Sequence, residues 1–168
     1  MGQSEIPTFL VDASCEPAAV KIAGRACFQN SGCLREFFTE MIKDGRRRFM
    51  VDFGGCASMD STFLGVLAGT ALELRRLDPP GTVVLCNIGA RNLELVRNLG
   101  LHRIMTVDAN GECPSGDKPE ALHQERTGET ENAKLVLKAH EDLVAAVPEN
   151  QEKFQDVLEF LKTRVNGS

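Results

Sequence analysis

Three residues that could carry chemistry stand together in the run SMDSTFLG, which occupies residues 58–65. Asp60, Ser61 and Thr62 follow a strand-like run and precede an apolar helical pattern, so we predict that they open a helix. Asp or Ser at such a position is first a helix cap, since its oxygen accepts hydrogen bonds from free backbone amides. The same amides and the positive end of the helix dipole also favour a bound anion.

Phosphorylation is the chemistry that this arrangement suits. A phosphate at the exposed Ser61 hydroxyl would add about −1.5 to −2 charges at one point. The helix start would tolerate that charge, whereas Asp60 and any acidic partner would be repelled. We therefore interpret Ser61 as a candidate switch and Thr62 as a candidate second acceptor, with Asp60 and Ser58 shaping the site.

The elements around this run alternate between strands and helices. Short apolar runs predict strands at residues 9–11, 19–23, 49–53, 82–86 and 104–107. Apolar positions at helical spacing predict helices at residues 34–42, 62–77 and 91–99. Gly54 and Gly55 are expected to end the third strand, which leaves a loop before Asp60. This order predicts an α/β domain over residues 6–108 with mostly parallel later strands.

The remaining residues differ in character. Residues 109–130 are rich in Gly, Pro, Ser and charged residues and predict a linker. Residues 131–166 carry two apolar stripes at helical spacing and predict a helical hairpin. Those stripes must be covered, either by folding back on the sheet or by pairing in a homodimer. Within the second helix of the domain, Gly65 and Gly69 are expected to give tight packing on a strand.

Charge and hydropathy exclude several classes of protein. The net charge of −5 lies in the C-terminal third, because residues 1–110 carry 12 acids and 12 bases. Nucleic-acid binding needs a basic face and is not expected. No apolar stretch reaches the roughly 18 residues that span a bilayer, and residues 1–7 do not have the pattern of a secretory signal. We expect a cytoplasmic protein without direct membrane insertion.

Cysteine and glycine patterns indicate no metal and no cofactor. The six cysteines match no zinc spacing, and reduced, partly buried thiols are the expected state. None of the three histidines pairs by spacing with a cysteine or an acid as a metal site. No phosphate-binding or dinucleotide glycine motif is present. A hydrolase using Cys56 or Ser58 would lack a spaced base and acid, so we do not expect an enzyme.

Residues 50–53, MVDF, and residues 59–67, MDSTFLGVL, resemble the signature of the STAS domain (sulfate transporter and anti-sigma-factor antagonist). The resemblance extends over residues 6–108 and implies a mixed sheet with helices packed against it. In the antagonist branch of that family, the serine after the aspartate is phosphorylated by a kinase that is also an anti-sigma factor. The matching serine is Ser61, so the resemblance implies a phosphorylation-switched binding protein with such a partner.

One departure from the family pattern supports an alternative. The family often has an acid after its second strand, whereas the run here is Gly24-Arg25-Ala26-Cys27. Stand-alone STAS proteins also serve as constitutive subunits of lipid-transport ABC complexes, without a phosphorylation cycle. The missing acid makes that second function more credible for this chain.

Overall fold

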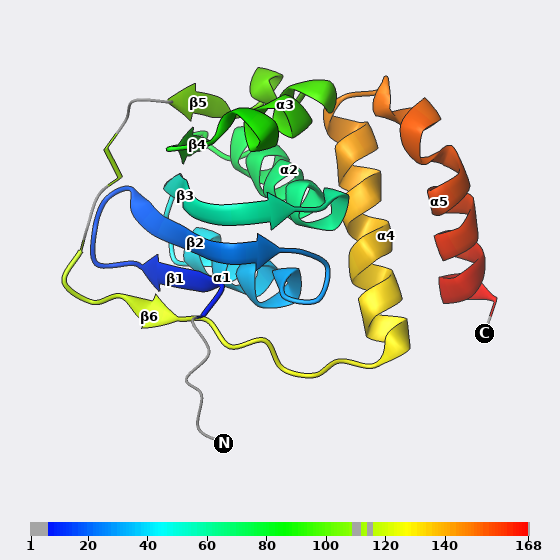
Figure 1. Ribbon diagram of the computed structural model, residues 1–168, viewed down its shortest axis with the longest axis horizontal. Coiled ribbons are helices and arrows are strands. Elements are labelled where there is room, and N and C mark those ends of the chain that lie inside the picture. Colours follow the sequence, from blue (N-terminus) through cyan, green and yellow to red (C-terminus); the bar gives the residue numbers. More distant parts are fainter. Residues whose placement is uncertain (1–6, 109–111, 114–115, 168) are drawn as a thin grey trace.

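The computed structural model describes residues 7–108, 112–113 and 116–167. Residue 6 of the predicted domain and parts of the predicted linker, residues 109–111 and 114–115, lie outside the described residues. A six-stranded sheet in the order β5-β4-β3-β2-β1-β6 forms the body of the protein (Figure 1). Its strands are β1 (Phe9–Asp12), β2 (Ala18–Ala26), β3 (Arg48–Met59), β4 (Thr82–Cys86), β5 (Thr106–Asp108) and β6 (Glu120–Ala121). The four strands from β2 to β5 run parallel, and β1 and β6 are antiparallel to their neighbours.

Helices connect the parallel strands, as the alternating pattern predicts. They are α1 (Ser31–Lys43), α2 (Ser61–Arg75) and α3 (Ala90–Asn98), and a 3-10 helix, η1 (Leu101–Arg103), precedes β5. In Figure 1, α1 and α2 lie on the same face of the sheet. The predicted mixed α/β fold is therefore confirmed.

Alternating burial along the strands explains why the helices cover one face. Val20 and Ile22 of β2, like Phe49 and Val51 of β3, are fully buried, whereas Lys21 between the β2 pair is exposed. Aromatic rings fill the space between sheet and helices. Phe38 of α1 meets Phe49 edge-on, with 5.1 Å between ring centroids.

The predicted end of the third strand is wrong. β3 does not stop at Gly54 and Gly55 but continues to Met59, directly before α2. A Cβ atom at Gly55 would lie 2.7 Å from the carbonyl oxygen of Ile22, so glycine lets the two backbones approach. The β2–β3 register shifts on both sides of this contact, which marks a bulge instead of a chain end.

The C-terminal part of the chain adds to the sheet and then covers a helix. Residues 120–121, inside the predicted linker, form β6 and pair with β1. The predicted hairpin is confirmed as α4 (Glu129–Ala146) and α5 (Asn150–Asn166). Figure 1 shows α4 beside α2 and α5 on the outer side of α4, and the most extensive contact of α4 is with α2. In the described part of the chain, no helix has the length and apolar character to cross a membrane.

Candidate functional site at the start of helix α2

Asp60 is the N-cap of α2 and also ties this helix to a loop from elsewhere in the chain. Its Oδ1 accepts a hydrogen bond from the amide of Phe63 at 2.9 Å, which is the capping geometry that the sequence predicts. Its Oδ2 accepts a second bond, at 2.8 Å, from the amide of Phe28 in the turn between β2 and α1. The side chain therefore fixes the site by structural bonds on both oxygens.

Ser61 is the first residue of α2, but its hydroxyl is not free. The Oγ lies 2.8 Å from Nε2 of His140, which is on α4, and Ser61 is half-buried. Nδ1 of the same imidazole lies 2.7 Å from the carbonyl oxygen of Val136. A carbonyl oxygen only accepts, so Nδ1 carries the proton in the neutral ring, and Ser61 donates to Nε2. The expectation of an exposed hydroxyl is therefore wrong.

His140 is the partner of Ser61 that sequence reasoning missed. The residue is only 4% exposed, and its ring packs edge-on against Phe154 of α5, with 4.9 Å between the ring centroids. The one available signal was a polar residue within the apolar stripe of α4. Its partner lies 79 positions away, so no local spacing rule could pair the two residues.

The glycines of α2 face helix α4 and not a strand, contrary to the expectation from the sequence. A Cβ atom at Gly65 would overlap the backbone carbonyl of Ala139. A Cβ atom at Gly69, one turn further along, would overlap the side-chain carboxylate of Asp142. Ser61, Gly65 and Gly69 recur every four residues and so form one stripe of small residues, against which α4 packs closely.

The other predicted site residues are less accessible or only border the site. Thr62 is 3% exposed, so its hydroxyl lies in the protein interior. Ser58 is half-buried in β3, opposite Arg25 of β2. Burial raises the pKa of the Cys56 thiol, and a neutral thiol is a poor nucleophile. Of the described hydrogen bonds, none joins Cys56 or the Ser58 side chain to a histidine, so the hydrolase hypothesis gains no base.

Two cysteines do not fit the expectation of reduced thiols. Cys86, at the end of β4, forms a disulfide with Cys113. Cys113 lies 27 positions further along the chain, a long-range contact that cysteine spacing does not reveal. Asp52 lies close by, and these three residues make up the one group with metal-ligand chemistry among the described residues. Their sulfurs are bonded to each other and are therefore not available as thiolate ligands.

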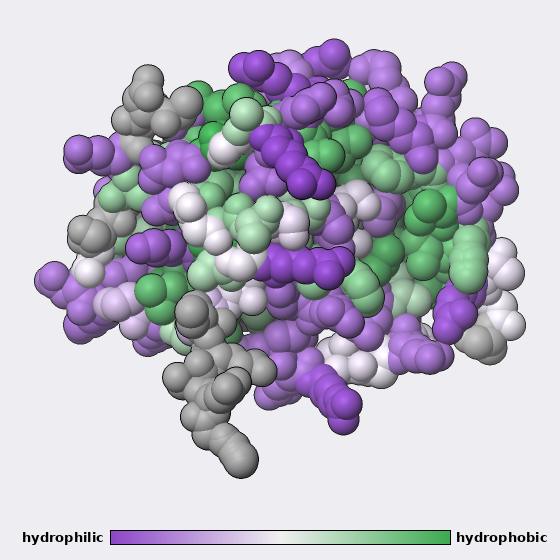
Figure 2. Space-filling view, in the orientation of Figure 1, coloured by the Kyte–Doolittle hydropathy of each residue, from purple (hydrophilic) through white to green (hydrophobic). Residues whose placement is uncertain are grey.

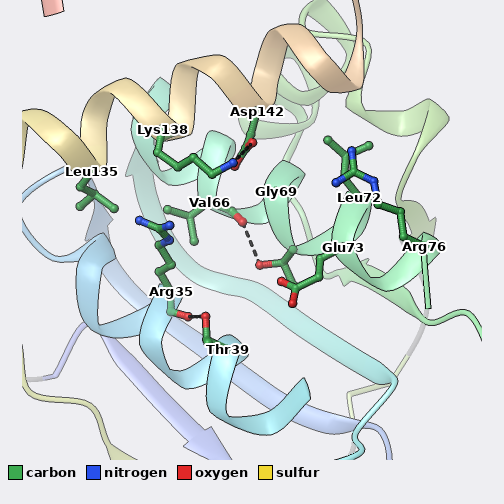
Figure 3. A pocket seen from close by; sticks show the side chains of 12 residues that line it. Arg35, Thr39, Val66, Gly69, Leu72, Glu73, Arg76, Leu135, Lys138 and Asp142 are labelled. Carbon is green, nitrogen blue, oxygen red and sulfur yellow. Dashed lines mark hydrogen bonds and ion pairs between the residues drawn. The ribbon is translucent and has the colours of Figure 1, made fainter. Parts of the chain in front are cut away.

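A cleft of about 210 Å³ lies between α1, α2 and α4 (Figure 3). The Arg35 side chain extends into it, and Lys138 pairs with Asp142 at 2.9 Å on its α4 side. Glu73 of α2 and Arg76, which follows this helix, line it as well, so the cleft carries side chains of both charges.

The mixed sheet, with α2 opening behind the Asp60 cap, defines the class of domain, and comparisons with known proteins identify the family. A family model described as "Mlab, STAS domain" matches residues 9–107, which is more than half of the chain. The chain therefore belongs to the STAS domain family. No curated protein matches the chain.

Solved structures of the same fold agree with this assignment. One is the anti-sigma factor antagonist SpoIIAA in its unphosphorylated form, with 18% identity and a TM-score of 0.50, covering 61% of this chain and 89% of that one. Another is the Bacillus cell fate determinant SpoIIAA in the phosphorylated form, with 18% identity, a TM-score of 0.50 and coverage of 61% and 92%. At this identity the likeness concerns the fold.

Proposed function

We propose that this chain is a phosphorylation-switched binding protein, similar to the anti-sigma-factor antagonists, and not an enzyme. Its partner would be a serine kinase that also acts as an anti-sigma factor. The observation that carries the proposal is the position of Ser61 as the first residue of α2, behind the Asp60 cap, within the region that matches the STAS family. SpoIIAA, which shares the fold, is known in a phosphorylated and an unphosphorylated form.

The local chemistry supports a switch at this point. A phosphate on Ser61 would lie at the N-terminus of a 15-residue helix, where the dipole and the first amides favour negative charge. The same charge would repel Asp60, whose carboxylate is the anchor of the Phe28 turn. Phe28 is 40% exposed and offers a partner an apolar contact beside the serine. Phosphorylation would therefore change the charge and the shape of one small surface.

Phosphate mapping tests this proposal. The protein is incubated with the partner kinase and ATP, and the phosphorylated residue is located by mass spectrometry. We expect phosphate on Ser61, its loss in Ser61→Ala, and no change in Thr39→Ala, which removes an exposed hydroxyl on α1. Thr62→Ala tests the second acceptor. Absence of phosphate from Ser61 and Thr62, with partner binding indifferent to Ser61→Asp, would refute the switch.

A constitutive subunit of a lipid-transport ABC complex is the second candidate function. Two observations favour it: the Ser61 hydroxyl already donates to buried His140, and Arg25, near the end of β2, stands where the antagonists often have an acid. In that case an ATPase and a permease should co-purify with the protein. Ser61→Ala and Ser61→Asp should then bind them equally well, which the switch does not allow.

Location and self-association complete the proposal. We infer a cytoplasmic protein, because Cys15, Cys27, Cys33 and Cys56 are free, as in a reducing compartment. In that compartment Cys86 and Cys113, which are paired here, are expected to be reduced. We also infer a homodimer through the C-terminal helices. Val157 and Phe160 of α5 are 41% and 55% exposed, and Figure 2 shows hydrophobic surface on the side of the molecule where α5 lies. Exposed apolar side chains of this size commonly mark an interaction surface.

A further inference from the structure

The α4–α5 hairpin covers the candidate switch with a fitted helix surface. Ala139 and Leu143 of α4 are 2% and 0% exposed, so this helix shares the core of the domain. Ala139 lies against Gly65 at the closest approach of the two helices. The next residue of α4, His140, accepts a hydrogen bond from the hydroxyl of Ser61, which lies one turn before Gly65 in α2. We call the α4–α5 hairpin the cover of this site, since its helix α4 contacts both Ser61 and the stripe of small residues.

Polar contacts hold the far end of the cover in place. Asn150, at the start of α5, is fully buried, and its Nδ2 donates to the carbonyl oxygens of Leu99 and Leu143, each at 3.0 Å. Its Oδ1 is buried without a partner among the described residues. Arg103 and Glu149 form an exposed ion pair at 2.9 Å nearby. These contacts fix the hairpin to the domain at the α3–η1 end.

The near end of the cover is held differently. Residues 122–128 form neither helix nor strand before α4 begins. Gln124 fixes this segment to α1, since its Oε1 accepts from the amide of Cys33 at 2.8 Å. The residues after Gln124 are exposed up to the start of α4. A short exposed segment between a fixed point and a helix lets the helix move without unfolding the sheet.

We propose that α4 is an autoinhibitory stand-in for a helix of the partner protein. In this state it covers Ser61 and occupies the Ser61–Gly65–Gly69 stripe. The partner presents a helix with a small residue at the crossing, displaces α4, and so gains both the α2 surface and the serine. That Ser61 is then phosphorylated rests on the proposed function, whereas the displacement of α4 by a partner helix does not.

Helix α4 must leave Ser61 before phosphorylation, because the Oγ atom of Ser61 has to give up its hydrogen bond to His140. In that reaction Ser61 Oγ bonds to the γ-phosphorus of ATP, the bond from that phosphorus to the ADP oxygen breaks, and the hydroxyl proton passes to a base of the kinase. Here the Ser61 hydroxyl donates to Nε2 of His140 at 2.8 Å. The imidazole therefore occupies the place that the base of a kinase would take. A kinase therefore reaches the serine only after α4 has moved.

A graded series of glycine substitutions tests the cover in the full-length protein. Gly65→Ala places a methyl group against backbone of α4, which must shift. Gly69→Ala meets only the end of the Asp142 side chain, which can rotate away, so a smaller effect is expected. Gly89→Ala is the matched control, because its Cβ would meet nothing within 4 Å. Alanine is a better helix former than glycine, so α2 itself stays intact in the first two variants.

Two readouts separate this inference from the proposed function. Hydrogen exchange of the α4 amides should be at least tenfold faster in Gly65→Ala than in the wild type or Gly89→Ala. In a second variant, Leu143→Ala, which loosens α4 and leaves the stripe of α2 unchanged, phosphorylation of Ser61 by the partner kinase should rise by a similar factor. If α4 stays protected in both Gly65→Ala and Leu143→Ala, the inference is wrong.

The remaining outcomes are equally decisive. If α4 opens while Ser61 phosphorylation keeps its wild-type rate, the cover does not regulate the site, and the proposed function survives alone. If no variant takes phosphate on Ser61, the proposed switch fails. Capture of the partner then decides the inference, and it must be stronger for Leu143→Ala, which loosens α4 and leaves the stripe of α2 unchanged, than for Gly89→Ala.

Discussion

Asp60→Ala should destabilise the protein by removing two bonds that originate from one carboxylate. Oδ1 caps α2 through the amide of Phe63, and Oδ2 holds the amide of Phe28. Loss of a helix cap costs about 1 kcal/mol. A hydrogen bond to a charged group is worth about 1.5 to 3 kcal/mol, and we take the lower end because the Phe28 turn is exposed and water can replace the bond. The sum is a loss of about 2 to 3 kcal/mol.

Asp60→Asn is the matched variant, because it keeps the shape and one oxygen. The remaining amide oxygen can still cap α2 through Phe63. The new NH₂ group would face the amide of Phe28, donor against donor, so that bond alone is lost. We expect the destabilisation to be smaller than in Asp60→Ala, at about 1 to 2 kcal/mol.

Urea unfolding followed by far-UV circular dichroism measures both variants, since the chain has no Trp and no Tyr to report by fluorescence. Hydrogen exchange then locates the effect. In Asp60→Asn only the Phe28 amide should exchange faster, whereas in Asp60→Ala the Phe63 amide should follow. Equal destabilisation by the two variants, or a loss below about 0.5 kcal/mol for Asp60→Ala, would refute the assignment of one bond to each oxygen.

Three further predictions concern other parts of the chain. The hydroxyl of Ser14 holds the pKa of Asp12 below its ordinary value of 3.8. The ionised Asp12 therefore stabilises the fold above that pH, and this contribution is lost as the pH falls through the lowered pKa. In Ser14→Ala the loss should occur at a higher pH, as measured by urea midpoints between pH 2 and 6. Cys113→Ser opens a disulfide between residues 27 positions apart and should cost the oxidised protein about 3 kcal/mol, with stability equal to that of the reduced wild type. Phe160→Glu should turn a dimer of the wild type into a monomer by light scattering, and an unchanged mass would exclude pairing through α5.

Local patterns were enough to predict most of the fold. Apolar runs and helical spacing are properties of neighbouring residues, so the strands around Val20 and Val51 and the helix after Asp60 could be recognised directly. The extension of β3 could not, because Gly54 and Gly55 are typical of a chain turn. Their actual role, a close approach to β2 at Ile22, depends on a neighbour that is distant in sequence.

The candidate site could be predicted only in part, for the same physical reason. The cap at Asp60 is a local interaction over three residues, and the sequence indicates it clearly. The partner of Ser61 is His140, on a helix that the sequence could place either on the sheet or in a homodimer. Only the tertiary packing of α4 brings the two side chains to 2.8 Å. Sequence reasoning thus identified the Ser61 hydroxyl and missed its hydrogen-bond partner, His140.

Helix α2 itself explains why the cover should exchange with a partner and not simply open. Ten of its fifteen residues are buried, so apolar side chains cover more than the single face that a sheet can bury. A helix that is apolar on most sides needs a second covering surface. The matched STAS region ends at residue 107 and does not include α4 or α5, which provide that surface here.

Removing α4 with nothing in its place would expose this side of α2 to water, at about 25 cal/mol for each Å² of apolar area. Val66 and Ala68 are 5% and 0% exposed within that helix. A partner helix that takes over the same stripe would bury the surface again and offset the loss. The energetics of α2 therefore favour exchange of one helix for another. They also predict that Gly65→Ala weakens the contact with α4 and requires a small residue on any helix that replaces α4.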